Sequence, residues 1–328
     1  MAKARAIVKR RKAVRNIKKI TKTMQMIATA KFQKSLKRAV GTKPYTQKVR
    51  ELVRDLAATV GNVEHPLLRK VTDENRTNRV AVVVLTSNRG LAGAYNGSVL
   101  RAAGAFLRQQ EAAGRTVELY VAGKKGISYF NFQRRPIAGR LEIADPPRAA
   151  DANRVADDMM RRFTVGELDA VYVCFMNFLS AGSQKPDVLE LLPLAGVTEI
   201  ADHIGQQSAE KEAQSDAGAL NLTHTGPAAQ AKPGEVRSLD AGVVYDFYPD
   251  AASILGELLP LTVQTAFFQT YLDAATSEHV ARMVSMKSAT DNADKMAKAL
   301  TMQYNRARQS QITTELSEIM GGVEAMKS

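Results

Sequence analysis

The sequence predicts an α/β protein in which a long antiparallel coiled coil, made by an N-terminal and a C-terminal helix, stands on a central α/β domain. Two observations predict the coiled coil. A helical stretch with few helix breakers lies at each end of the 328-residue chain, and each stretch carries a narrow seam of regularly spaced residues. A third observation predicts the central domain, because β-branched runs alternate with helical patterns between the two ends. The expected divisions are the N-terminal helix at 1–62, the α/β domain at 75–198, a variable and partly mobile insert at 199–242, and the C-terminal helix at 243–328.

The N-terminal helix is expected over residues 3–60, which hold one glycine, Gly41, and one proline, Pro44. These two residues are expected to kink or interrupt it. Its apolar side chains recur at steps of three and four residues, which is helical periodicity with a narrow stripe. The stripe consists of Ile17, Ile20, Met24 and Ile27. Such a stripe is more typical of a coiled-coil strand than of a surface helix on a globular domain.

The same segment concentrates the positive charge of the chain. The net charge is +13, and residues 1–50 hold seventeen Lys and Arg residues with no Asp or Glu. The remaining residues are slightly acidic, with 29 basic against 33 acidic side chains. A basic block of this kind fits a nucleic-acid arm, a mitochondrial transit peptide or a helix that meets an acidic partner.

The central domain is expected to be Rossmann-like, with a partly parallel sheet covered by helices. Arg79–Thr86 is a continuous β-branched run, which indicates a strand buried on both faces. The other expected elements, in order, are a helix at Asn96–Ala113, a strand at Val117–Val121, a helix at Arg148–Phe163, a strand at Ala170–Met176 and an antiparallel strand at Asp187–Leu192.

The last helix is expected from about residue 258 to residue 326, with Pro260 near its start and no further Gly or Pro until Gly321-Gly322. At 1.5 Å per residue, ~60 residues of such a helix extend ~90 Å, so it must project beyond a compact domain. Its seam follows alternating steps of three and four residues for more than four heptads. The seam consists of Met283, Met286, Thr290, Ala293, Ala297, Leu300, Tyr304, Ala307, Gln311 and Thr314.

Patterns for catalysis, cofactors or metals are missing. Cys174 is the single cysteine, and the four histidines are scattered without ligand spacing. Gly123-Lys124-Lys125-Gly126 lacks the order of a phosphate loop. The turn Ser87–Gly93 follows a strand and precedes a helix, where an anion could bind. A purely structural turn is favoured there because the wider nucleotide context is absent. We therefore expect no catalytic, cofactor or metal site.

Four stretches of the chain match the motifs of one protein family. They are Lys18–Lys34 (KKITKTMQMIATAKFQK), Thr86–Asn96 (TSNRGLAGAYN), Asn177–Leu194 (NFLSAGSQKPDVLELLPL) and Ser277–Gly322. They resemble the gamma subunits of F-type ATP synthases, and the last is the longest and most specific match. Asn88 and Ala92 depart from that family's usual Asp and Cys, and both lie in the predicted turn. The single cysteine excludes the thiol switch of the plant-type members.

The resemblance implies a non-catalytic subunit, the central rotor shaft that couples rotation of the membrane c-ring to conformational cycling of the catalytic beta subunits. The coiled coil would enter the hexamer of alpha and beta subunits, and the α/β domain would dock with the epsilon subunit on the c-ring. Lys18–Lys34 resembles the start of the mature family members, so no removable leader is expected. That start implies a bacterial chain, peripheral at the cytoplasmic face of the plasma (inner) membrane.

The resemblance also implies which residues contact the beta subunit. Arg308 and Gln309 match a pair that meets a loop of beta, and Thr313 and Glu315 match nearby positions. Met24 matches a methionine near an acidic segment of beta. The residue implied to face it from the C-terminal helix is Arg282.

Two other functions compete with this reading. The basic segment fits a coiled-coil nucleic-acid-binding protein, although it lacks interleaved aromatic residues and any known reading motif. A nucleotide-binding α/β enzyme would depend on the turn at Ser87–Gly93 alone. We therefore expect no nucleic-acid partner.

Overall fold

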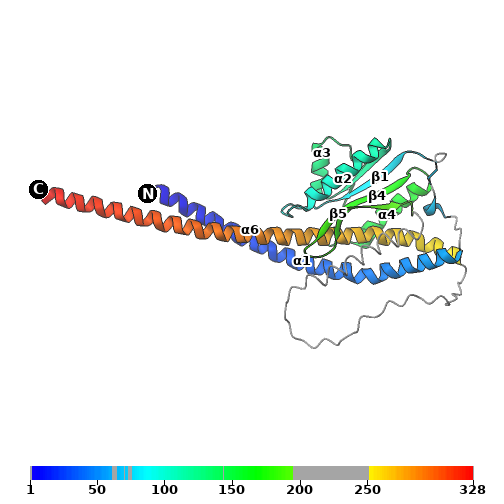
Figure 1. The fold of residues 1–328 in the computed structure, drawn as a ribbon, viewed down its shortest axis with the longest axis horizontal. Helices are drawn as coiled ribbons and strands as arrows, with labels where there is room; N and C mark the ends of the chain where they lie inside the picture. Colours follow the sequence, from blue (N-terminus) through cyan, green and yellow to red (C-terminus); the bar gives the residue numbers. More distant parts are fainter. Residues whose placement is uncertain are drawn as a thin grey trace, which may run out of the picture.

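Two long helices form a shaft that carries an α/β domain on one side (Figure 1). The structure, a computed structural model, describes residues 2–60, 65–69, 71–72, 76–142, 144–194 and 251–327. Helix α1 (Ala2–Val60) is antiparallel to helix α6 (Ala251–Lys327), whose 77 residues reach ~115 Å at 1.5 Å per residue. The predicted fold class is confirmed. The expected insert at 199–242 lies outside the described residues.

The α/β domain is built on a five-stranded sheet with the order β3-β2-β1-β4-β5. The strands are β1 (Arg79–Leu85), β2 (Thr116–Ala122), β3 (Gly139–Leu141), β4 (Ala170–Phe178) and β5 (Gln184–Leu192). Strand β1 is central and runs parallel to both β2 and β4, whereas β5 is antiparallel to β4. The β-branched run predicts this position well, because every residue of β1 after Arg79 is buried.

Helices cover both faces of the sheet, and α6 is one of them. The remaining helices are α2 (Tyr95–Ala112), α3 (Lys124–Phe132), α4 (Ala149–Thr164) and the 3₁₀ turn η1 (Pro66–Leu68). Val82 and Val84 of β1 point into a core formed with α2 and α3. Ala81, Val83 and Leu85 point the opposite way, into a core formed with α4 and residues 259–274 of α6. The C-terminal helix is therefore both part of the domain core and half of the shaft.

The register of the shaft is fixed by direct contacts between its two helices. Buried hydroxyls meet at Thr21–Thr290 and Ser35–Thr276, both 2.8 Å apart, and Thr42 donates to Gln269 at 3.2 Å. From the first pair to the second, the residue number rises by 14 on α1 and falls by 14 on α6, so the two antiparallel helices keep the same register between these contacts. Further out, Lys18 pairs with Asp294, and the Arg11 guanidinium lies 4.7 Å above the Tyr304 ring.

The predicted stripe of α1 was wrong. Ile17, Ile20 and Ile27 are 52%, 59% and 53% exposed, and only Met24 is half-buried. The buried stripe of α1 includes Val14, Thr21, Ala28, Phe32, Ser35 and Ala39, all of which except Phe32 are smaller than isoleucine. Small side chains and hydroxyls let two helices approach closely, and hydroxyl pairs satisfy each other across the contact. Ranking residues by hydrophobicity therefore selected the neighbouring face.

Most other elements agree with the predictions, and the differences are as follows. Helix α1 continues through Gly41 and Pro44 without interruption, and α6 begins at Ala251, so that Pro260 lies inside it. The seam of α6 is buried or half-buried from Met283 to Gln311, and Thr314 is exposed. Helix α3, strand β3 and turn η1 were not predicted.

Candidate functional site

The distal end of α6 extends beyond α1. Thr21 is level with Thr290, so the 19 residues from Thr21 back to Ala2 place Ala2 level with Gln309. Residues 310–327, here called the overhang, therefore have no part of α1 beside them. Figure 1 shows the C-terminal end of the shaft as a single helix that reaches past the N-terminus. At 1.5 Å per residue the overhang is ~27 Å long.

An apolar stripe runs along the overhang on one face. Its members, at alternating steps of four and three residues, are Ile312, Leu316, Ile319, Val323 and Met326. Their exposed fractions run from 43% to 84%. At 100° per residue this face lies about 130° around the helix from the last two seam residues, Gln311 and Thr314. The stripe is therefore not an unused continuation of the coiled coil, but a second apolar surface that faces away from α1.

Four of the six predicted contact residues flank this stripe. Arg308, Gln309, Thr313 and Glu315 are all exposed. On the helix they lie along the two borders of the stripe, with Arg308 and Glu315 on one side and Gln309 and Thr313 on the other. Glu315 accepts a hydrogen bond from Gln311 at 2.8 Å, and the Thr313 hydroxyl donates to the Gln309 carbonyl at 3.0 Å. The end of the shaft thus presents an apolar strip with polar edges.

The other two predicted residues lie elsewhere, where the shaft meets the α/β domain. Met24 is half-buried, and Arg282 is only 9% exposed. Between Arg282 and Arg308 the helix advances 26 residues, or ~39 Å. The structure therefore separates the predicted residues into two groups, one at each end of the projecting part of α6.

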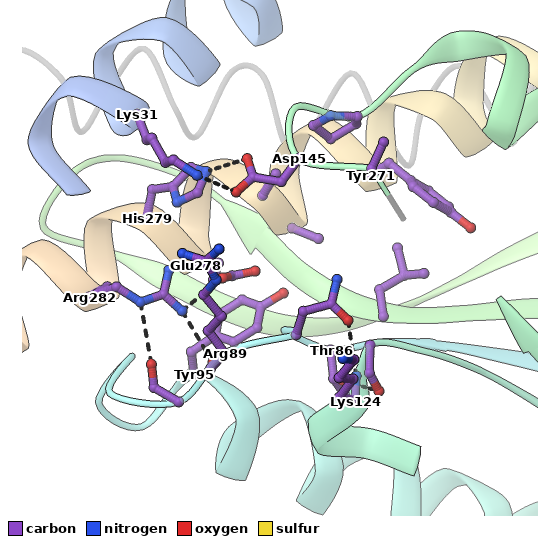
Figure 2. A pocket seen from close by; sticks show the side chains of 18 of the residues that line it. Lys31, Thr86, Arg89, Tyr95, Lys124, Asp145, Tyr271, Glu278, His279 and Arg282 are labelled. Carbon is purple, nitrogen blue, oxygen red and sulfur yellow. Dashed lines mark hydrogen bonds and ion pairs between the residues drawn. The ribbon is translucent and has the colours of Figure 1, made fainter. Parts of the chain in front are cut away.

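Arg282 is engaged inside the chain (Figure 2). Its guanidinium forms an ion pair with Glu278 at 2.8 Å and donates to the carbonyls of Gly90 at 3.3 Å and Arg89 at 3.2 Å. These contacts fasten the turn after β1 to α6. Burial raises the pKa of Glu278, although the neighbouring Arg282 opposes this. Arg282 therefore holds the domain to the shaft.

Hydrogen bonds within the chain hold the turn after β1 at its start. The Ser87 amide donates to the Asn96 side chain at 3.0 Å, and the Ser87 hydroxyl donates to the Arg89 carbonyl at 2.6 Å. The first amides of α3 are also occupied, since Lys124 donates to the Asn88 side chain and Gly126 donates to the Thr86 hydroxyl. These three amides are therefore already used within the chain.

The glycines of the Gly123–Gly126 motif are required by close packing. Gly123 has φ +90°, and a Cβ there would lie 2.1 Å from the Thr86 carbonyl oxygen. A Cβ on Gly126 would lie 2.7 Å from the Thr86 hydroxyl. The motif therefore marks the contact between β1 and the start of α3, which explains its glycines without a bound phosphate.

A cluster of ionisable side chains joins α1, α6 and the loop after β3, and the sequence analysis missed it. Lys31 of α1 pairs with Asp145 at 2.5 Å, and the Nε2 atom of His279 on α6 lies 3.5 Å from the same carboxylate (Figure 2). Burial lowers the pKa of His279, with Asp145 opposing. Although burial opposes it, the contact with Lys31 lowers the pKa of Asp145. No spacing in the sequence links these three positions, so no local signal reveals the cluster.

The described part of the chain offers neither a reactive cysteine nor a metal-binding cluster. Burial raises the pKa of the Cys174 thiol to about 12, so the thiolate needed for reactivity is disfavoured. Within the described ranges, no three His, Cys, Asp or Glu side chains are grouped so as to hold a metal ion. No helix in the same ranges has a stretch that is long and apolar enough to cross a bilayer.

Comparisons with known proteins agree on one family. A family model described as ATP synthase matches residues 3–326. Curated relatives named ATP synthase gamma chain include those of Rhodopirellula baltica, 38% identical over the full length of both chains, and Leptospira biflexa, 35% identical over 99% of this chain and all of the relative. Among solved structures, a chain of the Euglena gracilis mitochondrial ATP synthase is 17% identical, with a TM-score of 0.61 over 99% of this chain and 95% of that chain.

Proposed function

Because this chain belongs to the ATP synthase gamma-chain family, we propose that its overhang is the part of the rotor shaft that contacts the catalytic subunits. The chain is the central rotor shaft of the complex, which couples rotation of the membrane c-ring to the conformational cycle of the catalytic beta subunits. It carries no active site of its own in this proposal. Its contribution is mechanical, namely to turn as one body and to present different sides to the subunits around it.

The observation that carries this proposal is the overhang itself. A partner that surrounded the shaft would bury the stripe Ile312–Met326, which faces away from α1 and is exposed in the isolated chain. The polar side chains Arg308, Gln309, Thr313 and Glu315 lie at its borders, where they would form hydrogen bonds and ion pairs to the walls of the alpha–beta hexamer. Exposed ion pairs of this kind are weak, at ~0–1 kcal/mol each, so they permit repeated breaking during rotation.

A second contact zone is proposed lower on the shaft. Helix α1 holds seventeen basic residues within positions 1–50, and the exposed Ile17, Ile20 and Ile27 lie between them. An acidic segment of the beta subunit would be attracted to this surface, with Met24 at its edge. Arg282, with its side chain engaged inside the chain, would act there chiefly by positioning the turn after β1.

The remaining partners are proposed from the role of the family. The α/β domain would be the foot that docks, with the epsilon subunit, on the ring of c subunits. The chain would thereby be peripheral to the membrane, at the cytoplasmic face of a bacterial inner membrane. The comparisons offer no support for the nucleic-acid alternative, and the basic residues of α1 fit an acidic protein surface in this proposal.

Reconstitution with the cognate alpha and beta subunits tests the proposal. The chain is expected to co-purify with them as an ATPase-active complex. The double variant Arg308→Ala/Gln309→Ala is expected to lower the ATPase rate of that complex about tenfold, because two polar contacts at the border of the stripe are lost. Gln303→Ala is the control, since Gln303 is also exposed but lies on the opposite side of the helix from the stripe. Failure to assemble, or equal rates for the double variant and the control, would contradict the proposal.

A further inference from the structure

A cavity lies between the shaft and the α/β domain, and the proposed rotor function does not use it. Its volume is 710 Å³, which is within the ~300–1,000 Å³ typical of sites for small molecules. Residues after three parallel strands form one wall, namely Thr86 and Arg89 after β1, Lys124 after β2, and Glu142 after β3. Helices α1 and α6 form the other. Because β1 is the strand where the order of the sheet reverses, the cavity lies where open α/β sheets usually bind ligands.

One buried polar atom on the wall of this cavity has no hydrogen-bond partner. His279, on α6, is 4% exposed, and among the described residues nothing bonds to its Nδ1 atom. Leaving a buried polar atom unsatisfied costs about 1–3 kcal/mol, so such atoms usually mark the place of a bound group. The ring of Tyr271 also lines the cavity, but its unpartnered hydroxyl points away from it (Figure 2).

The charges at the cavity favour an anion. Lys31 is paired with Asp145, and Arg282 is paired with Glu278, so these four largely cancel. The remaining charged residues are three cations and one acid, and in the described part of the chain none of them has an ion pair. They are Arg89, Lys124, Arg140 and Glu142. Basic side chains at the edge of a cavity with an apolar floor recognise phosphate groups. The floor includes Leu85, Ile127 and Leu141.

We propose that this cavity binds a phosphate ester of a small hydroxylated molecule. Arg89, Lys124 and Arg140 contact the phosphate, and the body of the ligand enters the cavity, where one of its hydroxyl groups bonds to Nδ1 of His279. The Ser87 amide and the first amides of α3 take no part, because they are already bonded within the chain. Since the walls belong to α1, α6 and the sheet, the ligand joins the shaft to the domain. This inference is independent of the contacts made by the overhang.

Ligand-observed NMR on the full-length chain tests the site, with ribose 5-phosphate as the probe and ribose as the uncharged control. We expect ribose 5-phosphate to bind with a dissociation constant of about 1 mM or tighter, and ribose to bind at least about tenfold more weakly. The double variant Lys124→Gln/Arg140→Gln is expected to lose at least about tenfold in affinity for ribose 5-phosphate. Arg108→Gln, a change of an exposed cation on α2 that does not line the cavity, is expected to bind as the unaltered chain does.

A second pair of variants separates a ligand contact from a change outside the cavity. His279→Gln alters the one unpartnered side chain on the cavity wall and should weaken binding of ribose 5-phosphate several-fold. Tyr271→Phe removes an unpartnered hydroxyl that points away from the cavity, so it should leave the affinity unchanged. Absence of binding at about 10 mM, equal binding of ribose, or unchanged affinity in the Lys124/Arg140 double variant each overturns the proposal. An unchanged affinity in His279→Gln overturns the part assigned to His279.

Discussion

Two stretches of α6 share one uninterrupted helix and have opposite surroundings. Residues 259–293 include Leu259, Val263, Phe267 and Val280, which are at most 1% exposed, and they form part of the domain core and of the seam with α1. In the overhang, apolar residues of similar size are 43–84% exposed. The same helical periodicity thus serves to anchor the helix at one end and to present a surface at the other. Burial within the chain, and not hydrophobicity, decides which residues stabilise it.

The largest expected effect is on the anchored stretch. Phe267 is fully buried and stacks edge-on with Tyr271, with ring centroids 5.0 Å apart. Phe267→Ala should lower the free energy of unfolding by about 3–5 kcal/mol, measured by denaturant titration. Leu316→Ala in the overhang should change it by about 0.5 kcal/mol or less. Comparable losses in the two variants would show that the overhang is packed in the isolated chain.

A smaller effect is expected where the domain is fastened to α6. Arg282→Met leaves the Glu278 carboxylate without its cation and two carbonyls of the turn without a donor. The free energy of unfolding should fall by about 3 kcal/mol. Arg308→Met, in an exposed position, should be nearly neutral.

A rescue variant makes this prediction sharper. Burial already raises the pKa of Glu278, so replacing it by a neutral amide removes the unpaired charge. The double variant Glu278→Gln/Arg282→Met should therefore be more stable than Arg282→Met alone. If the double variant is less stable than Arg282→Met, the unpaired Glu278 carboxylate is not the cause of the lost stability.

The hydroxyl pairs of the seam should contribute less again. Thr276 is fully buried. Its hydroxyl shares a hydrogen bond of 2.8 Å with the Ser35 hydroxyl, and it donates to the Leu272 carbonyl, one turn earlier in the same helix, at 2.7 Å. Thr276→Val keeps the shape but removes the hydroxyl, which should cost about 1–2 kcal/mol. Thr313→Val is the matched control, because the Thr313 hydroxyl lies on the exposed overhang and donates to the Gln309 carbonyl of the same helix. Equal losses in the two variants would assign the cost to helix propensity instead of the seam.

The smallest effect concerns pH. Burial lowers the pKa of His279 below its ordinary 6.5, so the unfolded chain takes up this proton more readily than the folded chain. The stability that His279 contributes is therefore present above 6.5 and is lost as the pH falls towards the folded value. Unfolding followed between about pH 7 and about pH 5 should show a shallower decline in His279→Gln than in the unaltered chain.

The charged neighbours of His279 are not expected to produce the same pH dependence of stability across that interval. Lys31 and Arg282 are the basic groups near His279. The contribution of Asp145 is lost only below its ordinary 3.8. Glu278 has a raised pKa, so its contribution is lost as pH rises, which is the opposite direction. An unchanged slope in His279→Gln would exclude this role.

The sequence predicted the parts of the fold that depend on local patterns. The run Arg79–Leu85 marked the central strand, and the spacing from Met283 to Gln311 marked the seam of α6. The stripe of α1 was misplaced because its true contacts are Thr21, Ser35 and other small residues, whose role depends on what faces them. Helix α3 was missed because its glycines resemble a turn, and their purpose becomes visible only beside Thr86.

The residues of the candidate site also divide into those that a local motif predicts and those that depend on distant contacts. The motif predicted Arg308 and Gln309, and the structure places both on an exposed stretch of helix. Arg282 belongs to the same motif, yet its burial against Gly90 depends on a contact across 192 residues, which spacing cannot reveal. The cavity and its unpartnered His279 depend on three separate parts of the chain meeting, so no local pattern predicts them.

The contact between Thr21 and Thr290 has a consequence for how the protein is made. The two residues are 269 positions apart, so α1 leaves the ribosome long before its partner exists. At ~5–20 residues per second, roughly 10–40 seconds separate the end of α1 from the start of α6. Strands β1 to β5 are complete by then, and α6 can add to them through Leu259, Val263 and Phe267. The two-helix shaft is thus expected to close last, as a long-range event that waits for the finished domain.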